Sequence, residues 1–83
     1  MGGLNHGVIA LISGRSQESI KERFLSALKD FVIDVKSAQE ILIEGRVILA
    51  ISLFCDPAHI GAIEKDISLL AETLNLDLAF DPL

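Results

Sequence analysis

The sequence contains no tryptophan and no tyrosine, and only four of its 83 residues are phenylalanine. Proteins that bind single-stranded nucleic acid stack its bases on aromatic side chains, and such side chains are scarce in this sequence. The chain also lacks an excess of basic residues, because 12 acidic residues stand against 7 lysines and arginines, for a formal net charge of −5. Phosphate backbones and anionic membranes attract basic patches, so neither nucleic acid nor a membrane is an expected partner.

Long apolar runs and cysteine pairs are missing as well. The longest apolar run, Val47 to Cys55, is far shorter than the ~20 residues that span a bilayer. Met1 to Gly7 carries no basic region of the kind that opens a secretory signal, so none is expected. A single cysteine, Cys55, excludes an internal disulfide and suits a reducing compartment. These features predict a cytoplasmic protein.

Apolar residues are abundant for so short a chain, at 51% of the sequence. The length has room for one domain, which we expect to span residues 1–83. A domain of this size buries only about 60–65% of its unfolded surface, so the apolar excess predicts a surface that is covered by a second subunit.

The first of two expected helices covers about residues 17–31. Ser16 is its expected N-cap, and Glu18 is placed in its first turn, where the helix dipole favours an acid. Its apolar residues recur at helical spacing and form one face. They are Ile20, Phe24, Ala27, Leu28 and Phe31.

The second helix is expected over about residues 57–74. Asp56 followed by Pro57 is typical of a helix start, with a cap residue before a proline at the first position. Asn75 is expected to end the helix in the left-handed conformation. The apolar stripe comprises Ile60, Ile63, Ile67, Leu70, Ala71 and Leu74.

Four strands complete the set of elements, over about residues 7–13, 33–43, 47–55 and 77–81. The first and third are apolar on both faces, which is typical of central strands. The second is the most polar and suits a sheet edge. The Glu44–Gly45 pair predicts a tight hairpin between the second and third strands.

The order of elements predicts an α+β, ferredoxin-like βαββαβ two-layer sandwich, with a four-stranded antiparallel sheet and two helices on one face. The right-handed crossover rule adds the expectation that the first and third strands are central neighbours, and that this pair runs parallel. Two helices leave the other face of the sheet open, with apolar residues of both central strands on it. We therefore expect a homodimer formed through the uncovered sheet face or an edge.

The polar segment between the first strand and first helix is the candidate ligand site. Backbone N–H groups at a helix N-terminus hold anions such as carboxylates. The candidate residues are Ser13, Gly14, Arg15, Ser16 and Ser19. The alternative interpretation is that Ser16 only caps the helix. The glycine and lysine spacing of a phosphate-binding loop is absent, which argues against a nucleotide.

Other chemistry-bearing residues predict no catalytic or metal site. Cys55, Asp56 and His59 are close in sequence, but no second histidine or cysteine pair completes a metal site. We expect no metal and no cofactor. A small acyl-phosphate hydrolase on the same fold is a weaker alternative, because Arg15 is present but an asparagine to position water is not.

Four segments carry a resemblance to the ACT domain, a ferredoxin-like module that binds small ligands. They are VIALISGR at Val8 to Arg15, FLSALKDF at Phe24 to Phe31, QEILIEGRVILAISL at Gln39 to Leu53, and LNLDLAFDP at Leu74 to Pro82. Together they most resemble the N-terminal regulatory domain of SerB-type, particularly actinobacterial, phosphoserine phosphatases.

The resemblance implies a regulatory module that binds an amino acid such as L-serine and acts on an attached phosphatase domain of serine biosynthesis. It implies no catalysis by this chain, which contains no D-x-D-x-T/V motif. Such ACT domains carry a D-R-P-G-like stretch after the first strand, where this chain has Ser16 to Ser19. Ser19 takes the place of the glycine, and its side chain beside Glu18 is expected to crowd and repel a carboxylate. The alternatives are a ligand-free dimerisation module and a stand-alone ACT protein.

Overall fold

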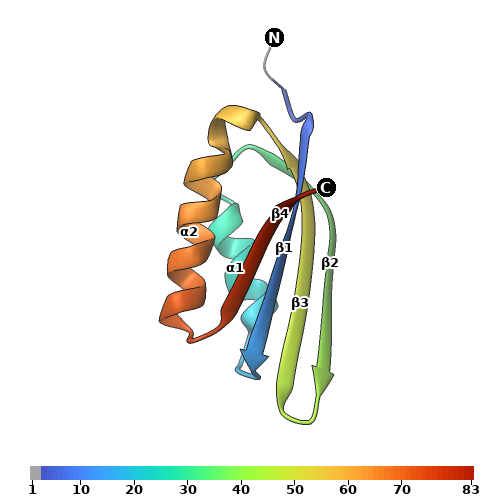
Figure 1. Cartoon of the computed structure of the whole chain (residues 1–83), viewed down its shortest axis with the longest axis vertical. Coiled ribbons are helices and arrows are strands. Elements are labelled where there is room, and N and C mark those ends of the chain that lie inside the picture. The colour runs from blue at the N-terminus through green and yellow to red at the C-terminus, as the bar shows by residue number, and fades with distance from the viewer. Residues whose placement is uncertain (1–2) are drawn as a thin grey trace.

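Over the residues that the structure describes, four strands and two helices follow one another in the expected order (Figure 1). The computed structural model describes residues 3–83, and the first two residues of the expected domain lie outside this range. The elements are β1 (His6–Arg15), α1 (Ile20–Leu28), β2 (Ile33–Ile43), β3 (Arg46–Cys55), a 3₁₀ turn (Pro57–His59), α2 (Ile60–Thr73) and β4 (Asp77–Pro82).

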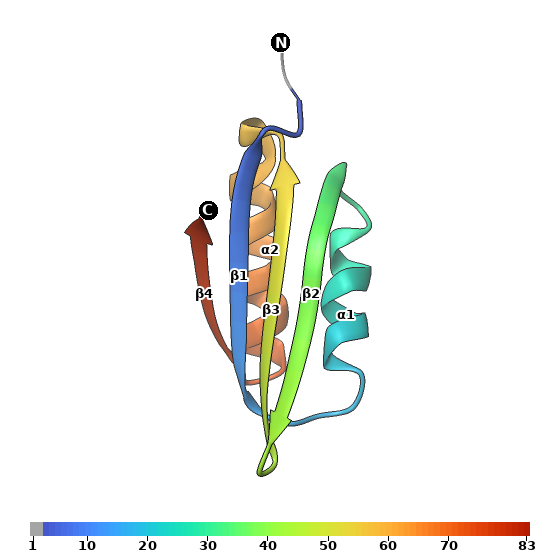
Figure 2. The ribbon, with the colours of Figure 1, turned by 90° about the vertical axis from the view of Figure 1, so that its right-hand side faces the viewer.

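The sheet has the strand order β2-β3-β1-β4, and each neighbouring pair is antiparallel (Figure 2). This confirms the α+β, ferredoxin-like fold with β1 and β3 in the centre. The expectation that β1 and β3 run parallel is wrong. The crossover through α1 places β2 two positions away from β1, and the hairpin then returns β3 antiparallel into the gap between them.

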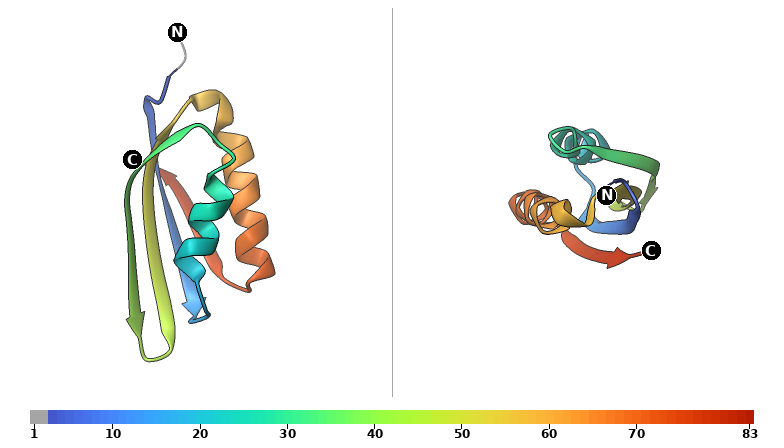
Figure 3. Two further views of the ribbon diagram at one scale, coloured as in Figure 1. Left: turned by 180° about the vertical axis from the view of Figure 1, so that it is seen from behind. Right: turned by 90° about the horizontal axis from the view of Figure 1, so that it is seen from above.

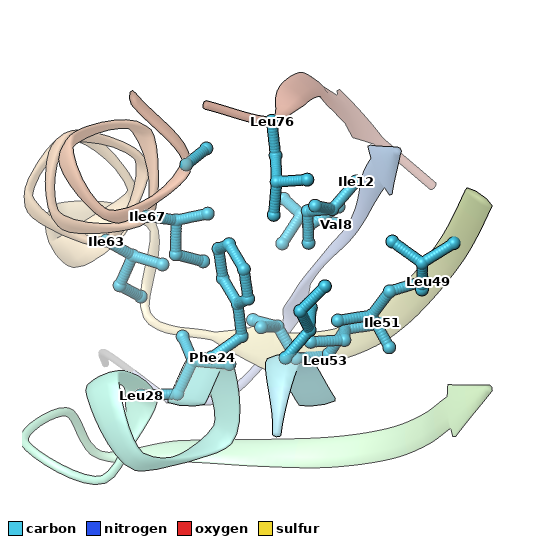
Figure 4. Close-up of a cluster of buried hydrophobic side chains, with 14 of the residues drawn as sticks. Val8, Ile12, Phe24, Leu28, Leu49, Ile51, Leu53, Ile63, Ile67 and Leu76 are labelled. Carbon is cyan, nitrogen blue, oxygen red and sulfur yellow. The ribbon is translucent and has the colours of Figure 1, made fainter. Parts of the chain in front are cut away.

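Both helices pack on the same face of the sheet, so the molecule has two layers (Figure 3). Alternate residues of β1 and β3 point into the core between the layers, because successive side chains in a strand face opposite sides. Figure 4 shows them meeting the apolar faces of both helices around Phe24, which is fully buried. The core comprises Val8, Ala10, Ile12, Val47, Leu49, Ile51, Leu53 and Cys55 from the central strands, Ile20, Phe24, Leu28, Ile63, Ile67 and Ala71 from the helices, and Leu76.

The helix α1 is shorter than expected at both ends. It begins at Ile20 rather than residue 17, because Ser19 has φ 59° and ψ 34°, a left-handed conformation that cannot continue a right-handed helix. The expected cap is therefore wrong: Ser19, not Ser16, occupies the N-cap position, and no side chain caps this end. After Leu28 the chain turns, and Phe31 contacts the core from the connection to β2.

Three local signals are confirmed. Asp56 accepts a hydrogen bond from the Ala58 amide at 3.0 Å and starts the turn that leads into α2. Asn75 follows α2 with φ 59°. Glu44 and Gly45 both have positive φ, 51° and 77°, as a two-residue type I′ hairpin turn requires.

Among residues 3–83, no layer covers the face of the sheet opposite the helices (Figure 2). The remaining residues of β1 and β3 lie there, with Leu11 40% and Ile48 45% exposed. The β2–β3 hairpin extends beyond the ends of β1 and both helices (Figures 1 and 3). Within residues 3–83, neither helix is long and apolar enough to cross a membrane.

Candidate functional site

The connection from β1 to α1 leaves the end of β1 and passes the β2–β3 hairpin on its way to the helix (Figure 2). The strand continues to Arg15, so three of the five candidate residues belong to β1 rather than to a loop. Ser13 and Arg15 share the parity of the exposed Leu11 and lie on the uncovered face. Ser16 and Ser19 belong to the connection.

Gly14 has the opposite parity and lies against the segment that follows α2. A Cβ atom at this position would come within 2.6 Å of Leu76 Cδ2 and 3.5 Å of Leu76 Cα. Leu76 is a core residue, only 8% exposed. Gly14 therefore allows the end of β1 to pack closely on the start of β4, a structural role that the sequence did not reveal.

The connection itself is held by two contacts distant in sequence. The Ser16 amide donates to the Gly45 carbonyl at 2.8 Å, which joins the connection to the hairpin turn. The Gln17 side-chain amide donates to the Leu74 carbonyl at 2.6 Å, which joins it to the end of α2. Because the Ser16 amide is already paired, it is not free to bind a carboxylate. The anion-binding role expected of this amide is not available in this conformation.

Ser19 stands where the connection becomes α1. Its carbonyl accepts the first helical hydrogen bond, from the Arg23 amide at 3.0 Å, but its hydroxyl caps no backbone group. The positive φ is the conformation that glycine adopts without a steric penalty. The backbone here thus has the form that a glycine favours, with a serine side chain added to it.

The five candidate residues lie in two parts of the structure, β1 and the connection to α1. Ser13 lies in the sheet, in register with Ile48 and Asp77, whereas Ser19 lies beside the first turn of α1. Arg15 is in register with Arg46, and this end of the uncovered face carries two guanidinium groups on adjacent strands. These residues are close in the sequence, which suggested a single site. In the structure the strand ends at Arg15, so three candidates lie in β1 and two in the connection.

A cleft of about 370 Å³ between α2 and β4 was not predicted from the sequence. Its polar lining includes Glu64, Glu72, Asn75 and Asp77, and none of the five candidate residues lines it. Three carboxylates would repel the carboxylate of an amino acid. The lining residues lie on α2, on β4 and on the turn that joins them, and the cleft depends on how these two consecutive elements pack rather than on a sequence motif.

Cys55 is fully buried at the end of β3, where burial first and the neighbouring Asp56 carboxylate second raise the pKa of its thiol above 9.0. A thiol with a raised pKa is a poor nucleophile, because the thiolate is the reactive form. Asp56 caps the following turn and His59 is exposed. Across residues 3–83, the side chains of histidine, cysteine and acidic residues form no group of three that could hold a metal ion.

No family model matches the sequence, and no curated protein matches it in sequence. Solved structures do match in shape. A candidate glycine cleavage system transcriptional repressor superposes with a TM-score of 0.88 over 98% of this chain and 47% of its own, at 12% identity. An ACT domain protein from Streptococcus pneumoniae gives 0.78 over 93% of this chain and 89% of its own, at 9% identity.

A third similar structure is the ligand-free regulatory subunit of aspartate kinase from Thermus thermophilus, with a TM-score of 0.71 over 99% of this chain and 56% of its own, at 17% identity. This chain therefore spans about half the length of the first and third of these proteins. At such low identities the likeness establishes the fold, which is the ferredoxin-like arrangement that ACT-domain proteins share.

Proposed function

We propose that this chain is a regulatory, non-catalytic module that binds a small amino acid, L-serine first among the candidates, in the cytoplasm. The fold supports the proposal, because structures that match it include an ACT domain protein and the regulatory subunit of an amino-acid kinase. The sequence resemblance supports the narrower assignment to a phosphoserine phosphatase-like enzyme of serine biosynthesis, with an attached phosphatase domain as the catalytic partner.

The observation that carries the proposal is the backbone at Ser19. The resemblance places a glycine at this position, and φ 59° is a conformation that favours glycine. The turn has therefore kept the geometry that such a glycine would need. We place the ligand carboxylate at the N-terminus of α1, beside Ser19. The candidates Ser13 and Arg15 lie on the uncovered face of the sheet. Gly14 packs on Leu76 and the Ser16 amide is paired with Gly45, so these four residues are assigned no contact with the carboxylate.

Titration calorimetry of the chain with L-serine and a panel of other amino acids tests this proposal. We expect saturable heat with at least one amino acid at millimolar concentration, and tighter binding by Ser19→Gly, which removes the hydroxymethyl group from the ligand's approach. Ser26→Gly is the matched control, because Ser26 is an exposed residue inside α1 and its loss should leave affinity unchanged. Silence from wild type and Ser19→Gly across the panel would refute amino-acid binding.

The parent enzyme has a separate test. The gene downstream of Leu83 should encode a domain with a D-x-D-x-T/V motif, and adding the bound amino acid to the full-length enzyme should change its hydrolysis of phosphoserine. A different downstream domain would refute the phosphatase assignment while leaving amino-acid binding intact.

A second candidate function is a ligand-free dimerisation module. The uncovered sheet favours it, since exposed apolar residues on that layer need a partner. In this case the homodimer forms through the uncovered face or an edge and does not respond to amino acids.

A further inference from the structure

Two arginines lie side by side at one end of the uncovered face. Arg15 of β1 is in register with Arg46 of β3, and both residues are exposed. They share the parity of Leu11 and Ile48, so their side chains project from the face opposite the helices. Figure 2 shows this end of β1 beside the β2–β3 hairpin. Directly opposite residues of an antiparallel pair have Cβ atoms about 4.5–5.5 Å apart, so the two guanidinium groups share one small area of surface.

Neither guanidinium group has a partner among residues 3–83. The ion pair in this range joins Lys36 to Asp34, near the start of β2, and no side-chain hydrogen bond involves either arginine. Two carboxylates are close by register: Glu44 lies in the hairpin turn, and Asp77 is opposite Ser13 and lines the cleft between α2 and β4. Like charges that are directly opposite across two strands are destabilising. An anion bound between the arginines would remove this repulsion.

The backbone that carries the two arginines is fixed on both sides. The pairing of β1 with β3 extends to Arg15 and Arg46. One residue beyond this pair, the Ser16 amide donates to the Gly45 carbonyl at 2.8 Å. On the hairpin side, Arg46 is also in register with Ile43 of β2. A ligand of the guanidinium groups therefore has to order only two side chains, which lowers the entropic cost of binding.

We propose that Arg15 and Arg46 bind the phosphate group of a small phosphate monoester on the uncovered face. Each guanidinium group presents a planar fork of N–H donors that holds two oxygen atoms. A single carboxylate is filled by one such fork and leaves the second arginine unpaired. A phosphate monoester has three terminal oxygens and about two negative charges near pH 7, which is enough for both forks.

The neighbours of the arginines complete the proposed site. Ser13 lies two residues before Arg15 on the same face, and its hydroxyl can donate a further hydrogen bond to the phosphate. Ile43 and Ile48 lie on the hairpin side, 54% and 45% exposed, and offer an apolar surface to the organic part of the ester. The proposed amino-acid site lies elsewhere, beside Ser19, so this inference goes beyond the proposed function and does not rest on it.

NMR titration of the amide signals tests the site, with phenyl phosphate as the probe. We expect saturable shifts confined to residues 13–16 and 43–48, with millimolar affinity because both guanidinium groups are exposed to water. Inorganic phosphate should bind more weakly because it lacks the apolar part, and benzoate, with one carboxylate, should give no saturable shifts. Lowering the pH from 7.5 to 5 should weaken binding of phenyl phosphate, because a monoester takes up a proton with a pKa of about 6.

Arg15→Gln and Arg46→Gln should each weaken binding by about three- to fivefold, because each removes one of the two forks. The matched control is Lys65→Gln, which removes the same charge from an exposed position on α2. In about 0.1 M salt, charges more than about 10 Å apart are screened, so this variant should bind as wild type does. The same spectra show whether each variant is folded.

Four results would overturn the site: no saturable shifts in wild type, unchanged affinity in either arginine variant, an equal loss in Lys65→Gln, or saturable binding of benzoate. Inorganic phosphate that binds as tightly as phenyl phosphate would overturn the assignment to a monoester. Ser19→Gly should leave phosphate binding unchanged, and no amino acid is present in these titrations. Failure of the phosphate site is therefore distinguishable from failure of amino-acid binding.

Discussion

Three non-glycine residues within the described range 3–83 adopt positive φ angles, and they are not equivalent. Asn75 tolerates the left-handed conformation because its short polar side chain can form local hydrogen bonds. In Ser19 and Glu44 the Cβ atom makes this conformation less favourable than it is for glycine. At Ser19 this cost has no visible compensation, since the hydroxyl makes no capping hydrogen bond. Ser19 is thus a strained position at the end of the connection on which the proposed ligand site depends.

Replacing Ser19 by glycine should stabilise the protein. The left-handed backbone costs a non-glycine residue about 1–2 kcal/mol, and the greater freedom of glycine in the unfolded chain offsets part of the gain. We expect the free energy of unfolding, measured by urea denaturation, to rise by about 0.5–1 kcal/mol. Ser26→Gly, the same change inside α1, should lower it by about 0.5 kcal/mol. Equal effects of the two variants would contradict the strain at Ser19.

At the scale of elements, the β2–β3 hairpin depends on its two-residue turn. Gly45 has φ 77° and open space around the position of a Cβ, so a side chain there would meet no other atom. Any penalty for a side chain at Gly45 therefore comes from the backbone alone. The turn matters beyond the hairpin, because the Gly45 carbonyl holds the Ser16 amide at 2.8 Å.

Gly45→Ala should destabilise the protein by about 1 kcal/mol, because alanine resists the positive φ that the turn requires. Gly61→Ala is the matched control: Gly61 lies in α2, also with nothing near its Cβ position, and alanine there should raise the free energy of unfolding by about 0.5 kcal/mol. Thermal or urea unfolding distinguishes the two signs. Destabilisation by both variants would argue against the turn conformation as the cause.

The elements that the sequence predicted well are those with local causes. Asp56 before Pro57 and the Glu44–Gly45 pair act through neighbouring backbone groups, and both appear in the structure as expected. The start of α1 was predicted poorly because three serines precede it, each with the chemistry of a cap. The left-handed conformation of Ser19 fixes which serine precedes the helix, and no residue type in the segment predicts that conformation.

At the scale of the whole molecule, strand order and layer arrangement followed from the order of elements and from two strands that are apolar on both faces. The candidate site did not follow in the same way. The contacts of Ser16 with Gly45 and of Gln17 with Leu74 join segments far apart in the sequence. These contacts hold the connection and occupy the Ser16 amide, and a prediction from adjacent residues could not include them.

The buried thiol of Cys55 makes the stability of the whole fold depend on pH in the alkaline range. Burial first, and the Asp56 carboxylate second, raise the pKa of Cys55 above its ordinary 9.0, so the native protein keeps a proton that the unfolded chain releases above pH 9.0. The native state then binds more protons than the unfolded state, and stability falls as pH rises. The contribution of the thiol is fully present below pH 9.0 and is lost as pH rises toward and through the folded-state pKa.

Cys55→Ala should therefore be less stable than wild type near neutral pH, by about 1 kcal/mol for the lost packing, and this deficit should shrink above pH 9.0. Because one proton is involved, the two free energies of unfolding should converge by at most about 1.4 kcal/mol per pH unit. Ile51→Val is the control: it removes a buried methyl group from the same strand without removing a titrating group, and its deficit should stay constant with pH. Urea denaturation at pH 7 to 10 measures both. A Cys55→Ala deficit as constant as that of Ile51→Val would show that the thiol ionises alike in the folded and unfolded chains.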